Sequence, residues 1–251
     1  MRNRHSWKPP LLFSVVFLML AGGCTTVGQP RPAPPPVAAA GSPQTDATGW
    51  WYARFRIPWP EDSEPRWHID VLLATELLAP IIEEHRDEVA LWRFHRRAAR
   101  DASGHQFSFI FYAPPETAAR IYENIRASAL VSELQAEGEI LDVSYDDVGA
   151  VRKPNLEDTS DPTWSPMLQR SWPYFIMGAS ELWLTLVTQV VESHPSGAPE
   201  NPKAKLDFYE QVDRAVQALW RHEGGHALLH HLNAIFQYEP LMVNRRQAMR
   251  F

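Results

Sequence analysis

The stretch LWRFHRRAARDASGHQFSFIFYA, residues 91–113, has the sequence pattern of a β-hairpin. Side chains alternate between the two faces of a strand, and the residues sharing one face here are Trp92, Phe94 and Arg96 in the first half and Phe107, Phe109 and Phe111 in the second. Asp101 to Gly104 separates the two halves with residues that favour turns. The stretch therefore predicts two antiparallel strands with a shared aromatic face.

The segments on either side of this hairpin complete an α+β pattern. Residues 51–57 alternate as a strand, and residues 69–91 have helical spacing in which Pro80 must kink the helix or start a new one. Residues 116–138 again have helical spacing, and residues 140–145 form a last strand. Strand, helix, strand, strand, helix, strand is the ferredoxin-like order. We expect residues 49–150 to form an antiparallel sheet with two helices on one face.

Residues 151–251 are predicted to be helical and to pack on the first region as one composite domain. A polar connection at 155–166 leads to a helix at 174–193 and to the longest helical run, 204–236. The stripe of that run is apolar at first and then polar, in the order Leu206, Tyr209, Val212, Val216, Leu219, Glu223, His226, His230 and Asn233. Buried polar groups are costly unless they are paired or bind a ligand, so we expect the chemistry of this chain to lie there.

The same run contains the sequence His222-Glu223-Gly224-Gly225-His226, which fits the pattern H-E-x-x-H and resembles zinc peptidases of the zincin type. On a helix both histidines can bind one zinc ion, while Glu223 takes a proton from the metal-bound water. Glu239, beyond the expected helix end, is the candidate third ligand. The alternative is a buried polar cluster that is satisfied by hydrogen bonds and holds no metal. Zinc is the only cofactor that the sequence suggests.

A second resemblance covers residues 50–251. Trp92 to Arg96, an aspartate-containing turn, His105 at the start of a strand and Leu228 to Asn233 resemble the C-terminal elimination domain of lantibiotic dehydratases, also known as the thiopeptide-type bacteriocin biosynthesis domain. That family removes glutamate from glutamylated serine or threonine in a peptide, using arginines and a histidine. The resemblance implies peptide binding by Arg96, His105 and Asn233 and catalysis by His230. Glu223, the other candidate catalytic residue, comes from the H-E-x-x-H pattern.

The chain departs from this family where the chemistry needs cations. Phe107 and Phe109 replace the alternating arginines after the strand-opening histidine, and Ala234 replaces the arginine after the late asparagine. Without them the expelled carboxylate has little stabilisation, so we expect peptide binding without elimination. The alternative for Arg96 and His105 is a pair of cross-strand charges on an exposed sheet face.

The N-terminus reads as an export and lipidation signal. Arg2, Arg4 and Lys8 precede an apolar stretch and then the small residues 21–23. Cys24, the only cysteine, follows them and resembles the acylated cysteine of a bacterial lipobox. We expect residues 1–23 to be a signal peptide and Cys24 the lipid attachment site; the alternative is an ordinary secreted protein with a free thiol. Thr25 after the cysteine favours an outer-membrane lipoprotein that faces the periplasm.

The remaining composition limits the partners. Residues 25–48 are rich in proline and small residues and read as a stalk after the lipidated cysteine. A formal net charge of −6 argues against nucleic acid as a partner. The expected function is an envelope lipoprotein that binds or processes a peptide; the alternatives are a zinc-dependent hydrolase and a structural lipoprotein without a small ligand.

Overall fold

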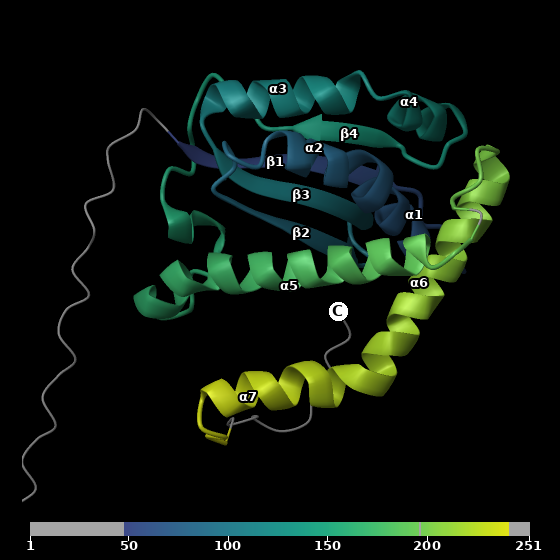
Figure 1. Ribbon diagram of the computed structural model, residues 1–251. Coiled ribbons are helices and arrows are strands. Elements are labelled where there is room, and N and C mark those ends of the chain that lie inside the picture. Colours follow the sequence, from purple (N-terminus) through teal and green to yellow (C-terminus); the bar gives the residue numbers. More distant parts are fainter. Residues whose placement is uncertain (1–47, 196, 241–251) are drawn as a thin grey trace, which may run out of the picture. The chain divides into compact units, whose positions relative to one another are not determined.

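The computed structural model describes residues 48–195 and 197–240, which belong to one compact unit (Figure 1). The predicted signal peptide, Cys24 and the stalk to residue 47 lie outside the described residues. The described part is a mixed α and β structure with a four-stranded antiparallel sheet, which confirms the predicted class.

The sheet consists of β1 (Gly49–Ile57), β2 (Leu91–Ala98), β3 (His105–Ala113) and β4 (Asp142–Tyr145), in the order β2-β3-β1-β4. The predicted hairpin is β2 and β3, paired from Leu91 opposite Tyr112 to Ala98 opposite His105. In its turn Asp101 Oδ1 accepts the N–H groups of Ser103 and Gly104. Gly104 has φ of 61°, which glycine adopts without steric cost.

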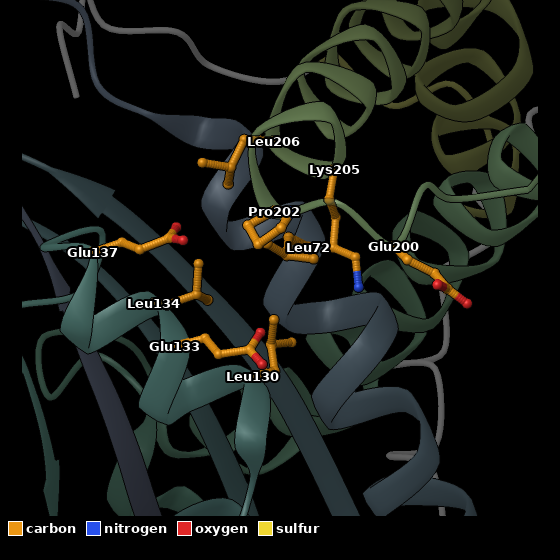
Figure 2. A pocket seen from close by; sticks show the side chains of 9 residues that line it. All are labelled: Leu72, Leu130, Glu133, Leu134, Glu137, Glu200, Pro202, Lys205 and Leu206. Carbon is orange, nitrogen blue, oxygen red and sulfur yellow. The ribbon is translucent and has the colours of Figure 1, made fainter.

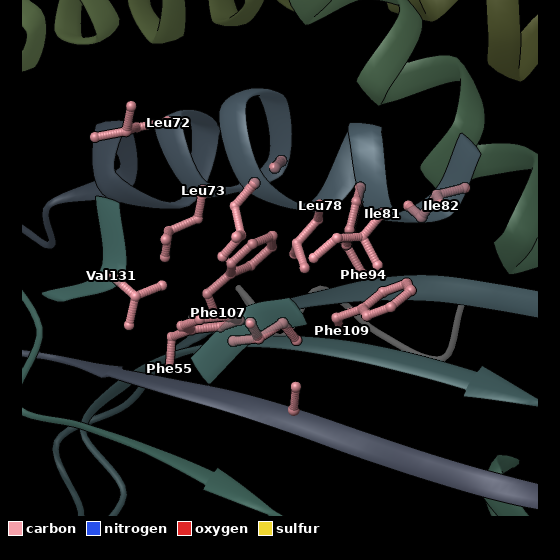
Figure 3. Close-up of a cluster of buried hydrophobic side chains, with 14 of the residues drawn as sticks. Phe55, Leu72, Leu73, Leu78, Ile81, Ile82, Phe94, Phe107, Phe109 and Val131 are labelled. Atoms are coloured by element: carbon pink, nitrogen blue, oxygen red, sulfur yellow. The ribbon is translucent and has the colours of Figure 1, made fainter. Parts of the chain in front are cut away.

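The first helical segment covers one face of the sheet in three pieces: α1 (Trp67–Leu72), the π-helix η1 (Leu73–Leu78) and α2 (Ala79–Glu84). Pro80 lies in the first turn of α2. Because proline lacks an N–H and its ring crowds the preceding turn, Pro80 explains why the preceding segment η1 is a wider π-helix. Figure 3 shows Leu73, Leu78 and Ile81 from this segment pointing at Phe107 and Phe109 of the sheet.

The second predicted helix is two helices. Helix α3 (Pro115–Arg126) ends before Ser128, which caps the start of α4 (Ala129–Ala136) by accepting the N–H of Val131. Tyr122 of α3 is buried against the sheet and donates its hydroxyl to the Tyr52 carbonyl. Burial raises the pKa of this phenol above its usual range.

The C-terminal half contains the short 3₁₀-helix η2 (Leu156–Thr159), α5 (Pro166–Glu192), α6 (Pro202–Gly224), the π-helix η3 (Gly225–His230) and α7 (His231–Ile235). Helix α5 begins eight residues before the predicted start and runs along the edge strand β2 (Figure 1). There the Phe94 N–H points away from the sheet and donates to Ser180 Oγ at 3.1 Å. Helix α5 therefore covers an edge that would otherwise be open to pairing.

Candidate functional site

The sequence-predicted residues fall into two groups, and Arg96 and His105 form the first of them. Arg96 on β2 donates from Nε to Asp70 Oδ2 at 2.9 Å and from Nη2 to Asp213 Oδ1 at 3.3 Å and to the Trp67 carbonyl at 3.0 Å. Its guanidinium also lies over the rings of Trp67 and Trp183. One cation thus joins α1, α5 and α6 to the sheet.

His105 reaches the same carboxylate from β3. Its Nε2 atom lies 3.0 Å from Asp70 Oδ1, and both side chains are fully buried, with 0% exposed surface. The contact is close but not aligned as a hydrogen bond, and Asp70 Oδ1 and both ring nitrogens have no hydrogen-bond partner among the described residues. The Trp67 ring packs edge-on against the imidazole at 4.8 Å.

The interpretation of Arg96 and His105 as charges on an exposed sheet face is wrong. Both side chains share the face that carries Phe94 and Phe107, and carboxylates of α1 and α6 lie against them there. We name Asp70, Arg96, His105 and Asp213 the buried ion network. Its carboxylates already occupy Arg96, and Asp70 and His105 are sealed from solvent, so its geometry is that of a structural junction rather than an open substrate site.

The second group lies at the end of the chain, in residues 217–240, which we call the C-terminal arm. Sequence periodicity predicted that Glu223, His226 and His230 continue the buried stripe, and this is wrong because all three are exposed. Val216 is the last buried side chain of α6; beyond it only Gly224 is buried, and η3 and α7 make their main contacts with α6 and with each other. The stripe keeps its register but no longer faces the core.

The arm gathers histidines in a different way from the predicted one. The rings of His226, His230 and His231 lie with centroids 5.2 to 5.5 Å apart, and the Tyr238 hydroxyl lies 3.2 Å from His230 Nε2. The π-helical turns of η3 explain this grouping, because i→i+5 bonding brings residues four and five apart onto one side.

The other predicted residues of the arm do not complete a metal site. His222 and Glu239 are exposed, Asn233 is half-buried, and no described contact joins the two predicted histidine ligands. Within residues 48–195 and 197–240, no three histidine, aspartate or glutamate side chains are placed to share one metal ion. The H-E-x-x-H sequence is therefore present without an assembled set of three ligands in the described part of the chain.

A larger concave surface lies elsewhere, between α2 and α5. This α2–α5 groove has a volume of about 440 Å³ and an apolar floor of Ala79, Ile82, Trp92 and Leu184. Its rim is polar, with three carboxylates and one guanidinium among its seven residues: Glu83, Arg86, Glu181, Thr185, Thr188, Gln189 and Glu192. Arg86 pairs with Glu83, whereas Glu181 and Glu192 have no ion pair among the described residues, so the rim carries excess negative charge. The sequence predicted the polar face of α5, but it did not predict that apolar residues of α2 and β2 lie across from that face.

A second hollow, shown in Figure 2, is too small for a ligand. Leu72, Leu134 and Leu206 line a cavity of about 20 Å³, with Glu133 of α4 and Glu137 just after that helix at its edge. That volume accommodates about one water molecule. Lys205 at its rim is already paired with Glu76 at 2.8 Å, and Tyr209 donates to the same carboxylate. This hollow is a packing defect between helices rather than a binding site.

Comparison of the chain with family models, with curated proteins and with solved structures gives no match. One further property bears on location: among the described residues, α5 alone is long and apolar enough to cross a membrane by length and composition. It packs along β2, where Ser180 accepts the Phe94 N–H, and its Val187 is buried in the core.

Proposed function

We propose that this chain is a lipid-anchored envelope protein that binds a peptide segment in the α2–α5 groove and does not modify it. The groove is the single observation that carries the proposal. Its volume lies in the range of ligand sites, its floor is apolar, and its rim supplies hydroxyls, an amide and carboxylates. Two helices flanking an apolar floor suit a segment that inserts side chains from one face, as in helix-in-groove recognition.

The rim defines the ligand's chemistry. Glu181 and Glu192 face the groove without a cationic partner among the described residues. A complementary segment carries two or three apolar side chains for the floor, with lysine or arginine beside them. Charge complementarity of this kind contributes mainly to specificity and association rate.

A ferredoxin-like arrangement is part of the proposal. The order of strands and helices along the chain, and the antiparallel sheet order β2-β3-β1-β4, support it. The buried ion network supports the absence of elimination chemistry, because Arg96 and His105 face carboxylates of the protein itself. The lipid anchor is carried by the sequence of residues 1–24 alone.

The test measures fluorescence anisotropy of a labelled peptide against residues 44–251, which include the whole core. The probe is an amphipathic peptide with leucines three and four residues apart and lysine flanks; its twin has glutamate flanks. We expect the lysine peptide to bind, and Glu181→Lys with Glu192→Lys to weaken it by about tenfold, on the scale of two exposed charge reversals.

The matched control is Glu116→Lys with Glu210→Lys, which changes the net charge equally on exposed positions of α3 and α6. Equal loss of affinity in both variants, or equal binding of both peptides, contradicts the proposed site. Zinc analysis of the untagged protein separates the hydrolase alternative: a stable zinc-to-protein ratio near one, lost in His222→Ala, would replace this proposal.

A further inference from the structure

Three histidine rings meet on the exposed C-terminal arm. The ring centre of His226 lies 5.2 Å from that of His230 and 5.5 Å from that of His231, and the last two lie 5.3 Å apart. We call these three residues the histidine cluster. All three side chains are exposed, and η3, which carries two of them, has no buried residue. Packing against the core therefore does not explain why the rings gather.

The widened turn of η3 brings the third ring into the cluster. In a regular α-helix, at ~100° per residue, the fourth residue after His226 lies about 40° around the axis from it and the fifth about 140°. His231 would then lie on another side of the helix. Hydrogen bonding from residue i to residue i+5 in η3 places it beside His226 instead, and such turns are frequent at functional sites.

A strained turn places a tyrosine against the same cluster. Gln237 and Tyr238 have φ of 59° and 57°, in the left-handed region that non-glycine residues rarely adopt. The Tyr238 N–H donates to the Asn233 carbonyl at 3.0 Å, and the Tyr238 hydroxyl lies 3.2 Å from His230 Nε2. The turn therefore holds a polar group against one ring of the cluster.

The spacing of the rings is that of imidazoles around one metal ion. A zinc–nitrogen bond of about 2.0–2.1 Å places each ring centre roughly 3.2 Å from the ion, so tetrahedral angles put neighbouring ring centres about 5.2 Å apart. The observed separations of 5.2 to 5.5 Å agree with this arrangement. Imidazole nitrogens bind zinc, copper and nickel, and the sequence contains no cysteine after Cys24 that would compete for such an ion.

Binding requires the rings to rotate. As the side chains stand, no three histidine, aspartate or glutamate residues of 48–195 and 197–240 are placed to share one ion. The three rings are exposed and the χ2 angle of histidine has broad minima, so turning a nitrogen inward disturbs no core packing. The contact of Tyr238 with His230 Nε2 leaves Nδ1 of that ring for the ion, and a metal-bound histidine commonly donates its other N–H to an oxygen.

We propose that the histidine cluster is a transition-metal site, in which His226, His230 and His231 bind one zinc ion and water takes the fourth position. His222 and Glu223 take no part, so the ligand set differs from that of the H-E-x-x-H pattern. None of the three ligands lines the α2–α5 groove, so metal binding is independent of peptide binding. The bound ion ties η3 to the start of α7.

Isothermal titration calorimetry of the untagged protein with zinc chloride tests the ligand set. We expect saturable binding of one ion per chain. His230→Gln and His231→Gln should each weaken binding by at least about tenfold, since even the loss of an outer partner of a ligand has an effect of that size. The matched control is His222→Gln, exposed on the same arm four residues before His226, and it should bind zinc as the wild type does. A zinc site at the H-E-x-x-H sequence predicts the reverse: loss in His222→Gln and none in His231→Gln.

Electron paramagnetic resonance of the copper-loaded protein counts the ligands directly. We expect hyperfine coupling to three nitrogens in the wild type and to two in His231→Gln, with circular dichroism unchanged because the replaced ring is exposed. Glu181→Lys with Glu192→Lys should leave zinc affinity unchanged, so failure of the groove and failure of the metal site are distinguishable. The proposal is overturned if zinc binding does not saturate, if His230→Gln or His231→Gln binds as the wild type does, or if His222→Gln loses affinity equally.

Discussion

Replacing Arg96 by methionine should be among the most destabilising single changes in this protein. The methionine keeps most of the apolar stem but removes the cation that pairs with both Asp70 and Asp213. Asp70 is fully buried and Asp213 nearly so. Removing one partner of a buried ion pair costs about 3–5 kcal/mol because a charge is left uncompensated. Two cation–π contacts, with Trp67 and Trp183, are lost as well.

The neighbouring residue supplies a matched control. Arg97 lies on the opposite face of the same strand and pairs with Asp101, which is exposed. An exposed ion pair contributes about 0–1 kcal/mol, so Arg97→Met should lower the free energy of unfolding by no more than that. Because both variants replace arginine by methionine, the difference between their unfolding free energies measures the effect of burying the ion pair.

The assay is equilibrium unfolding of residues 44–251 in urea, followed by tryptophan fluorescence and circular dichroism. We expect Arg96→Met to lower the free energy of unfolding by about 4 kcal/mol, a large part of the ~5–15 kcal/mol typical of a domain. Adding Asp70→Asn should recover part of that loss, because the buried charge is then removed. If Arg96→Met costs no more than Arg97→Met, the buried ion network does not hold the helices to the sheet.

Three other predictions follow from separate parts of the chain. Ser180→Val should cost about 1–3 kcal/mol in unfolding free energy, because it leaves the buried Phe94 N–H without an acceptor; urea titration measures this. Arg97 and the turn N–H groups hold the pKa of Asp101 at about 2, below its usual 3.8. The ionised carboxylate's contribution to the free energy of unfolding is therefore fully present above pH 4 and is lost as the pH falls through 2. Carbon-13 NMR titration of Asp101 should follow that range, and a midpoint near 3.8 contradicts the pairing. Cys24→Ser should move the protein from the membrane fraction to the soluble fraction, and unchanged detergent-dependent membrane association argues against lipidation.

The strands of this protein could be predicted because each has a local signal. Aromatic residues alternate through Phe107, Phe109 and Phe111, and Asp101 to Gly104 can form only a turn between the two halves of the hairpin. The helix expected from residue 174 in fact begins at Pro166 and continues through Pro173, although a proline in a helix interior removes one backbone hydrogen bond. The break at Ser128 was missed because the apolar spacing continues through it.

The buried ion network was beyond sequence reasoning because its members lie far apart in the chain. Arg96 is 26 residues from Asp70 and 117 from Asp213. The resemblance singled out Arg96 and His105 but not the carboxylates that occupy them. The polar stripe of α6 was mispredicted for a different reason. Periodicity tells which residues share one side of a helix, but it does not tell whether the rest of the domain reaches far enough to bury them.

The occupation of Arg96 bears directly on what this site can do. An arginine that stabilises an expelled carboxylate must present free donors, and its charge must be uncompensated in the resting protein. Here Nε donates to Asp70, Nη2 donates to Asp213 and a backbone carbonyl, and two aromatic rings lie against the guanidinium. The two carboxylates that the fold holds against it already compensate its single charge, so it offers no net positive charge to an expelled carboxylate. The same contacts that make Arg96 a junction between α1, α6 and the sheet therefore argue against elimination chemistry at this residue.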